Sequence, residues 1–497
     1  MRSTAIGIAM LNDERKHVWT KNNPENMRVV KQWAKVIKDG LKNVDGTVPE
    51  VIVASQIITG VELAQKIGEE LARVNCKQII MCYNVWNFPF LVWPFINSIG
   101  NVPVLSLSNN NGQYPGNVGL LATDGALRQA GIRTHRIVGE IDDKETQAKV
   151  IEWCRASIAL TTIKNEVYGC YGGHSMGMET GFYHLTPTLK SLGTTVRQID
   201  QLWLVKAMER VDEKEVEKGF RWFEKLLGSR IKYDGKMLTP ETLKTQIRLY
   251  IAMREVNKDK GFDFCGLKGQ RELTEYVCLG DVPEMLMNDP YDWNGKKEPT
   301  VCATEADSYA AITMQLLKYI SGGLPTLFMD VRLYHPDKDL WDWCNSGNHA
   351  SYYANLSMKP EDNFKKITFY PALEYYFKAG GASVSFDAAP GKMTFCRLGL
   401  WDEKPYIVIV SGESLRRSEK ERKEINAQTN PTWPHVHARL DCTFEEFLSV
   451  FPCNHVLGIT EDRVRALTYL CEIAGITPVI LGSRGKERIV PIWEIVK

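Results

Sequence analysis

Two acidic residues, Glu305 and Asp330, each follow a short apolar run and are the side chains best placed for chemistry. The runs cover residues 300–303 and 326–329, and the apolar spacing between them predicts a helix that ends at Ser321-Gly322-Gly323. Strand, helix and strand at this length predict a parallel unit, so both strands should end at one edge of a sheet. Ligands collect at such edges. The two carboxylates should therefore lie side by side and could bind a divalent cation, exchange protons with a substrate, or do both.

Each of these carboxylates also has a purely structural interpretation. A Glu at a helix start is often a favourable charge near the helix dipole, and an Asp after a strand is often a turn residue. The pair at matching strand ends favours a functional site more than either residue does alone.

A metal held by two carboxylates usually gains a third protein ligand, and imidazole is a common one. The chain has nine histidines, and the residues alone leave the choice among them open. His435 and His437 form an HxH pair, whose spacing puts both rings on one face of a strand. Any single histidine is more often a structural residue than a ligand.

The composition narrows the classes of partner. The formal net charge is +1, from 61 basic and 60 acidic residues, which argues against a nucleic acid or an anionic membrane as partner. The 12 cysteines include no CxxC pair and several lie in apolar runs, which is typical of a reducing cytoplasm. We find no signal peptide and no apolar run long enough to span a membrane. A small molecule is the expected partner of a cytoplasmic protein.

The chain is too long for one hydrophobic core, so we expect about two to three domains. Strand-like runs at residues 4–10, 50–58, 78–83 and 102–107 alternate with helical segments at 26–41 and 60–74. This alternation predicts a doubly wound α/β domain over residues 1–160. A GxGxxG turn after its first strand is missing, which argues against a dinucleotide site and a nicotinamide dehydrogenase.

Two further domains follow. Residues 161–324 predict a second doubly wound α/β domain, which includes the glycine-rich loop 172–177 and carries Glu305. Residues 325–497 predict a mainly β, barrel-like C-terminal domain that carries Asp330 and His455 and closes with a helix near 462–474. Its short alternating runs lie at residues 367–370, 382–386, 393–400 and 406–410.

A series of short motifs is spread over all three predicted domains. Each motif is weak alone, but their order and spacing together are specific. They are Gly172-Gly173, Ser175-Met176-Gly177, Gly269-Gln270-Arg271, Asp292-Trp293-Asn294-Gly295, Ala303-Thr304-Glu305, Asp307-Ser308, Asp330-Val331-Arg332, Asn345-Ser346-Gly347, Thr432-Trp433-Pro434 and Asn454-His455. Through this series the chain resembles the L-fucose isomerase family. The resemblance implies an aldose–ketose isomerase that uses a divalent metal, commonly Mn²⁺, with Co²⁺ and Mg²⁺ as alternatives.

The resemblance also implies roles for particular residues. The metal ligands would be Glu305, Asp330 and His455, and the two carboxylates would also move protons. The residues that contact the sugar would be Arg15, Trp86, Gln270 and Asn454. Trp86 would reach the site of a neighbouring subunit, which implies a homo-oligomer, typically a hexamer. Neither His174 nor the HxH pair is a metal ligand in this family.

The substrate implied by the resemblance is a monosaccharide, L-fucose or D-arabinose or both, isomerised through an enediol. Another aldose, as in the related L-arabinose isomerases, is an alternative. A metal-dependent hydrolase or aldolase could use the same three ligands. A sugar-binding protein without catalysis would not need Glu305, Asp330 and His455 together.

Overall fold

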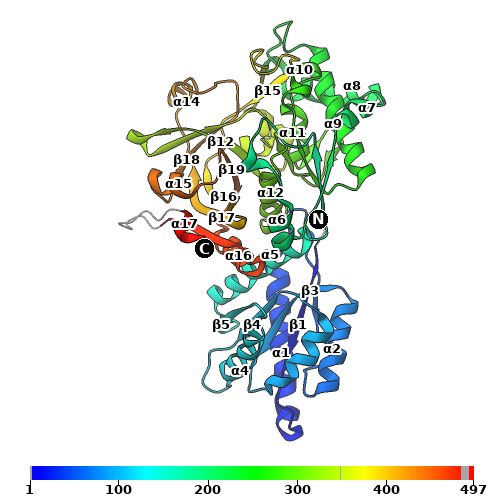
Figure 1. Cartoon of the computed structure of the whole chain (residues 1–497), viewed down its shortest axis with the longest axis vertical. Coiled ribbons are helices and arrows are strands. Elements are labelled where there is room, and N and C mark those ends of the chain that lie inside the picture. The colour runs from blue at the N-terminus through cyan, green and yellow to red at the C-terminus, as the bar shows by residue number, and fades with distance from the viewer. Residues whose placement is uncertain (1–2, 348, 483–491, 497) are drawn as a thin grey trace. The chain divides into compact units, whose positions relative to one another are not determined.

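The computed structural model describes residues 3–347, 349–482 and 492–496. The chain divides into two compact units, residues 1–162 with 465–475 and residues 163–464 with 476–497. Figure 1 colours the first unit mainly blue to cyan and the second mainly green to red. Helix α16 (Val464–Ala474) lies almost wholly in the first unit, so the chain returns there near its C-terminal end.

The first unit is built on a parallel sheet of five strands in the order β2-β1-β3-β4-β5. Helices lie against this sheet in Figure 1. Strands β1, β3 and β4 are buried almost throughout, as expected where helices cover both faces. The doubly wound prediction is confirmed. The elements are β1 (Ala5–Met10), α1 (Lys16–Gly40), β2 (Val51–Val53), α2 (Val61–Arg73), β3 (Cys76–Tyr83), α3 (Val92–Ile99), β4 (Val104–Ser108), α4 (Gly116–Gln129), β5 (Thr134–Val138) and α5 (Lys144–Ile163).

The second unit begins with a parallel sheet of four strands in the order β11-β8-β6-β7. Its strands and the helices around them confirm the second α/β domain. They are β6 (Val167–Tyr171), α6 (Leu185–Leu192), β7 (Thr195–Ile199), α7 (Leu202–Met208), α8 (Glu213–Leu227), α9 (Pro240–Lys260), β8 (Phe264–Leu267), α10 (Glu272–Tyr276), α11 (Asp281–Asn288), the β9–β10 pair (Tyr291–Asp292, Gly295–Lys296), β11 (Cys302–Thr304) and α12 (Ser308–Ile320). Every residue of α12 is buried, so this helix belongs to the core.

The rest of the second unit contains an antiparallel barrel. Strands β16, β19, β12, β13, β18 and β17 pair in that order, and the β16–β17 hairpin closes the ring. A closed ring has no free strand edge. The strands are β12 (Leu327–His335), β13 (Leu340–Cys344), β16 (Gly391–Trp401), β17 (Lys404–Ser414), β18 (His435–Leu440) and β19 (His455–Thr460). The barrel-like C-terminal domain is confirmed.

Several shorter elements accompany the barrel. Strand β20 (Thr477–Leu481) adds in parallel to β17, while β14 (Thr368–Pro371) and β15 (Ala382–Ser385) form a separate pair. The two predicted runs at 367–370 and 382–386 therefore pair outside the barrel. The helices are α13 (Pro360–Phe364), α14 (Glu419–Asn426), α15 (Phe444–Val450) and α17 (Ile492–Ile495).

The predicted parallel unit around Glu305 and Asp330 is wrong. Strand β11 lies in the four-stranded sheet, whereas β12 lies in the barrel and runs antiparallel to β19. Strand β12 also continues through Asp330 to His335 instead of ending there. The local pattern could not reveal this, because the partner of β12 lies far along the chain and pairing depends on that partner.

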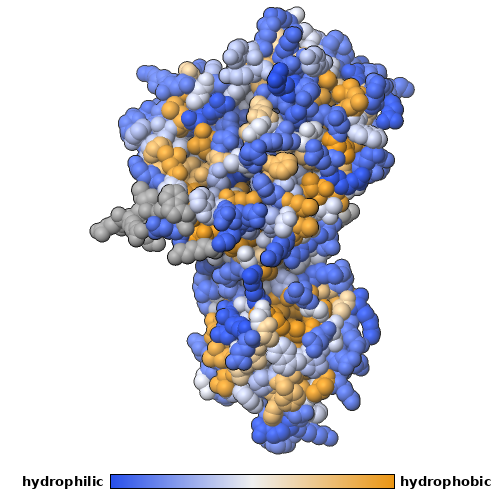
Figure 2. Space-filling view, in the orientation of Figure 1, coloured by the Kyte–Doolittle hydropathy of each residue, from blue (hydrophilic) through white to orange (hydrophobic). Residues whose placement is uncertain are grey.

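The visible face in Figure 2 is mostly hydrophilic, with hydrophobic side chains in scattered groups. Within residues 3–347, 349–482 and 492–496, no helix combines the length and the apolar character that crossing a membrane requires.

Candidate active site

Glu305, Asp330 and His455 converge in the second unit. The Nε2 atom of His455 lies 3.2 Å from Oε2 of Glu305 and 3.3 Å from Oδ1 of Asp330. The pairing of β12 with β19 puts Asp330 directly opposite His455. Both carboxylates line a cavity of about 250 Å³. Antiparallel strand pairing, and not a parallel unit, therefore brings Asp330 to the site.

The backbone at Glu305 has an unusual conformation. Glu305 and Ala306 have φ angles of +56° and +49°, a left-handed region that residues other than glycine rarely adopt. Such a conformation costs on the order of 1–3 kcal/mol per residue, and residues held in it often cluster at functional sites. The Ala306 N–H donates to the carbonyl of Leu267, at the end of β8. The parallel sheet thus holds the turn that presents Glu305 to the cavity.

Asp307 fixes the orientation of His455. Its Oδ2 atom accepts a hydrogen bond of 2.6 Å from Nδ1 of His455, and its Oδ1 accepts from the Ala310 N–H at the start of α12. Arg397, fully buried on β16, donates from Nη2 to Oδ1 and places Nη1 2.9 Å from Oδ2. Burial alone would raise the pKa of Asp307, but Arg397 and His455 outweigh it and hold that pKa well below its ordinary value. Asp307 is therefore ionised and keeps the His455 proton on Nδ1.

The atoms around Nε2 of His455 are suited to a cation. Although this nitrogen is buried close to two carboxylates, it makes no hydrogen bond within the described part of the chain. In the neutral ring with Nδ1–H on Asp307, Nε2 offers a lone pair beside Glu305 and Asp330. Two carboxylate oxygens and an imidazole nitrogen are ligands that divalent metals accept, and a carboxylate behind the imidazole is common in such sites. The residues present fit a metal of the kind that the resemblance implies.

Two of the predicted sugar-contacting residues lie at this site. Gln270 lines the cavity, and Asn454 Nδ2 donates to Asp330 Oδ1 over 3.3 Å. The cavity wall also includes Trp433, and the Arg332 guanidinium lies 5.0 Å from its ring centroid. Arg332 is also paired with Asp330 at 3.2 Å. The cavity thus combines polar side chains with the aromatic rings of Tyr376, Phe377 and Trp433, which is typical of a small-molecule site.

Arg15 and Trp86 lie in the first unit, and neither lines the cavity among the residues described. Arg15 pairs with Asp13 at 2.6 Å, and Trp86 packs edge-on against Phe88. Their assignment as sugar contacts stays a prediction. His174 lines a separate cavity of about 190 Å³.

Analysis of the sequence missed Asp307 and Arg397 as site residues. Both left a signal. Asp307-Ser308 precedes a helical apolar run, which is typical of a helix N-cap, and Asp307 does cap α12. Arg397 is the only charged residue in the apolar strand-like run 393–400, and a charge in the middle of a buried strand needs a buried partner.

The cavity contains another buried carboxyl that was not predicted. Asp281 begins α11 and accepts a hydrogen bond of 2.8 Å from Ser346 Oγ. Burial raises the pKa of Asp281 to about 7, although the hydrogen bonds it accepts oppose that change. Beside it, Gly347 has a φ of +90°, and a Cβ there would lie 2.5 Å from Oε2 of Glu284. Glycine is therefore required where this loop passes the cavity wall.

Replacing Asp281 by Asn should make the protein relatively more stable as the pH rises. The folded state holds the Asp281 proton up to a pKa of about 7, whereas an unfolded Asp loses its proton near pH 4. The parent should therefore lose stability as the pH rises from about 4 to about 7. The Asn variant has no carboxyl group to ionise and should not show this loss. Thermal unfolding of both proteins at about pH 5 and about pH 8 measures the difference. Asp339→Asn, at a side chain 46% exposed, is the control. A difference in midpoint that is equal at both pH values would contradict the prediction.

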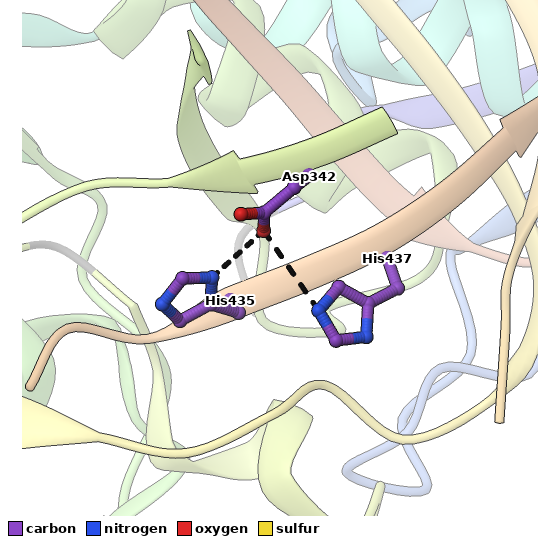
Figure 3. Close-up of side chains that lie close together, drawn as sticks. All are labelled: Asp342, His435 and His437. Carbon is purple, nitrogen blue, oxygen red and sulfur yellow. Dashed lines mark hydrogen bonds and ion pairs between the residues drawn. The ribbon is translucent and has the colours of Figure 1, made fainter. Parts of the chain in front are cut away.

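One further group could bind a metal. Asp342, His435 and His437 are all buried, and their ligand atoms lie within 4.8 Å of one another (Figure 3). None of the three lines the cavity that contains Glu305.

Three models of protein domains match the chain in sequence. They describe the first N-terminal domain of L-fucose isomerase (residues 3–165), its second N-terminal domain (166–322) and its C-terminal domain (343–481). The first two matches cover the two parallel sheets, and the third covers barrel strands β16 to β19 but not β12.

Curated relatives agree with these matches. The L-fucose isomerase of Bacteroides thetaiotaomicron is 26% identical over 490 residues, covering 82% of this chain and 80% of that protein. The L-fucose isomerase of Vibrio vulnificus is 24% identical over 470 residues, with the same two coverages. The L-fucose isomerase of Klebsiella pneumoniae is 25% identical over 507 residues, covering 86% of this chain and 83% of that protein.

Proposed function

Because this chain belongs to the L-fucose isomerase family, and is thereby an aldose–ketose isomerase, we propose that it interconverts L-fucose or D-arabinose with the matching ketose in a metal-dependent reaction. The observation that supports this proposal most is the convergence of Glu305 and Asp330, which line one cavity, on Nε2 of His455. The reaction moves a carbonyl from C1 to C2 through an enediol. It requires one group that carries a proton between the two carbons and another that serves the hydroxyl oxygens.

The two carboxylates of the cavity take these roles. One of Glu305 and Asp330 removes the proton from C2 and returns it to C1, and the other exchanges the hydroxyl proton. In the reverse direction the roles of acid and base exchange. A divalent metal held there would supply a Lewis acid for the negative charge that develops during the reaction, and it would keep both carboxylates ionised.

His455 and Asp307 prepare the site for the metal. We propose that Glu305, Asp330 and His455 hold it, with Mn²⁺ as the expected ion and Co²⁺ or Mg²⁺ as alternatives. Asp307 accepts the Nδ1–H of His455, which leaves Nε2 free to act as a ligand. Arg397 neutralises the buried Asp307 charge.

The assembly and the location of the enzyme stay predictions. We propose a homo-oligomer, hexameric by resemblance to the family, in which Trp86 of one subunit contacts the sugar bound by another. We also propose that the enzyme acts in the cytoplasm on a free monosaccharide, since the cysteines described are unpaired and almost all of them are buried.

Replacing His455 by Ala should weaken Mn²⁺ binding at this site by at least about tenfold, because one ligand and its Asp307 contact are lost. Isothermal titration of the metal-stripped protein measures the affinity. His135→Gln is the control, since His135 pairs with Glu472 in the first unit. An unchanged affinity in the His455 variant would remove this residue from the ligand set.

The proposed reaction can be tested by proton NMR in D₂O. The metal-stripped protein is incubated with L-fucose and with D-arabinose, with and without added Mn²⁺. We expect the matching ketose to appear only with metal, and deuterium to enter at C2 as the aldose re-forms. If neither sugar gives a ketose in protein that binds Mn²⁺, the substrate is another aldose, such as L-arabinose, or the enzyme is not an isomerase. Cleaved products would identify a hydrolase or aldolase instead.

A further inference from the structure

A second set of potential metal ligands lies on two strands of the barrel, and none of its residues lines the cavity of the proposed reaction. Asp342 comes from β13, and His435 and His437 come from the neighbouring strand β18 (Figure 3). The antiparallel register pairs Asp342 with His437, so the HxH spacing brings both rings to the same carboxylate. The three residues are 0%, 1% and 3% exposed. Groups this polar are buried only where they satisfy one another or hold an ion.

The donor atoms of this group are close enough to share one ion. Nδ1 of His435 lies 2.7 Å from Oδ1 of Asp342, and Nε2 of His437 lies 3.8 Å from the same oxygen. A fourth donor, Oδ1 of Asn426 at the end of α14, lies 2.9 Å from Nε2 of His437. In a tetrahedral Zn²⁺ site with bonds of about 2.0–2.1 Å, neighbouring ligand atoms lie about 3.3 Å apart. The separations of 2.7 Å and 2.9 Å are shorter than that value and the separation of 3.8 Å is longer, so small movements would fit the four atoms around one ion.

Hydrogen bonds to further residues orient the side chains that carry these four ligand atoms. Nε2 of His435 donates to the Asn430 carbonyl over 2.7 Å, and Thr429 Oγ1 donates to Oδ2 of Asp342 over 2.8 Å. Asn426 Nδ2 donates to Oδ1 of Asp387 over 2.9 Å, which turns its own Oδ1 toward His437. Metal ligands usually have such outer partners, which fix the tautomer and the orientation of each group.

The proton on Nε2 of His435 has a direct consequence. In the neutral ring Nδ1 is then an acceptor, and it faces an acceptor oxygen of Asp342 at 2.7 Å. Two acceptors at this distance require a cation between them, either a proton or a metal ion. A proton serves only His435 and Asp342, whereas a metal ion engages all four donor atoms.

We propose that Asp342, His435, His437 and Asn426 form a structural site for one Zn²⁺-class transition-metal ion, separate from the metal of the reaction. Two imidazoles with two oxygen donors suit such an ion better than Ca²⁺ or Mg²⁺, which take mostly oxygen ligands. The near-complete burial of the group is typical of a structural site, since catalytic sites keep a position open to substrate.

The proposed ion would connect β13, β18 and the end of α14. Between Asn426 and His435 the chain carries Trp433, which lines the cavity. Holding both ends of this segment would fix the position of Trp433 in the cavity wall. The site would thus support the cavity without touching the reacting atoms.

The test first eliminates the proposed metal site of the cavity by substitution of its two carboxylates. In the double variant Glu305→Gln/Asp330→Asn, dialysed against Zn²⁺ and then against metal-free buffer, elemental analysis should find one Zn²⁺ per chain. Adding His437→Gln should remove it. Co²⁺ added to the double variant should give the intense visible absorption of a four-coordinate site. This spectrum can be interpreted without the His437→Gln variant. Because this background lacks the two cavity carboxylates, the result does not depend on the proposed isomerase reaction.

Two results would overturn the proposal. If the double variant retains no Zn²⁺ and shows no such Co²⁺ spectrum, His435 and Asp342 share only a proton. If Zn²⁺ is retained equally after His437→Gln, the ion is held elsewhere. Circular dichroism of each variant checks its fold, and Asn426→Ala serves as the second variant if His437→Gln does not fold, with weaker Zn²⁺ retention expected.

Discussion

Glu305→Gln and Asp330→Asn should each abolish turnover, with kcat lower by about 10³-fold or more. Each change keeps the shape of the side chain but removes both a proton acceptor and a charged metal ligand. Neither side chain supports the core, because both line the cavity and are 17% exposed. The loss should therefore appear in kcat while the unfolding midpoint changes little. Ketose formation from L-fucose or D-arabinose, measured with saturating Mn²⁺, provides the test.

Glu413→Gln is the matched control for these variants. Glu413 lies on barrel strand β17, pairs with Arg439 at 3.5 Å and is 47% exposed, so its neutralisation should leave turnover unchanged. If either cavity variant retains more than about a tenth of the parent turnover, its carboxylate is not the acid or base of the reaction.

Asp307→Asn and Arg397→Met should each destabilise the protein by about 3–5 kcal/mol, because each leaves the charge of the other residue buried without its partner. The two side chains are 1% and 0% exposed. Asp307→Asn should also weaken metal binding, since a neutral amide holds the His455 tautomer less firmly than a carboxylate does. Urea unfolding and Mn²⁺ titration measure the two effects separately.

A double-mutant cycle tests whether Asp307 and Arg397 act as a pair. The combined variant should recover part of the stability that the two single variants lose, because no unpaired charge stays buried. Glu217→Gln breaks the exposed pair with Arg221 and should cost less than about 1 kcal/mol. Additive losses in the double variant would show that the two charges do not depend on each other.

Much of the fold follows from short-range patterns in the sequence. Strand and helix alternation predicted the first parallel sheet, and β1, α2, β3 and β4 form close to the expected residues. Short alternating runs after Pro325 predicted a mainly β domain, and β16 and β17 form its hairpin. These predictions are confirmed because periodicity depends on which face of an element is buried, a property of neighbouring residues.

The site shows where such patterns fail. The sequence pointed to Glu305 and Asp330 through a parallel unit that does not exist. The structure brings them near His455 by pairing β12 with β19, a strand late in the chain. Asp307 is adjacent to these motifs in sequence, yet its contacts with Arg397 and His455 depend on three separate elements meeting in space.

The sequence by itself determined the order of α/β domains and barrel, the acidic residues at the ends of apolar runs and, through its series of motifs, the family. Only the tertiary structure decided which strands pair and which ring nitrogen of His455 faces the two carboxylates. It also decided which carboxyls are buried enough for their pKa to change, as in Asp281 and Asp307. The reason is physical. Secondary structure follows from contacts between neighbours in the chain, whereas strand pairing, burial and electrostatics depend on distances between residues that the chain brings together only when it folds.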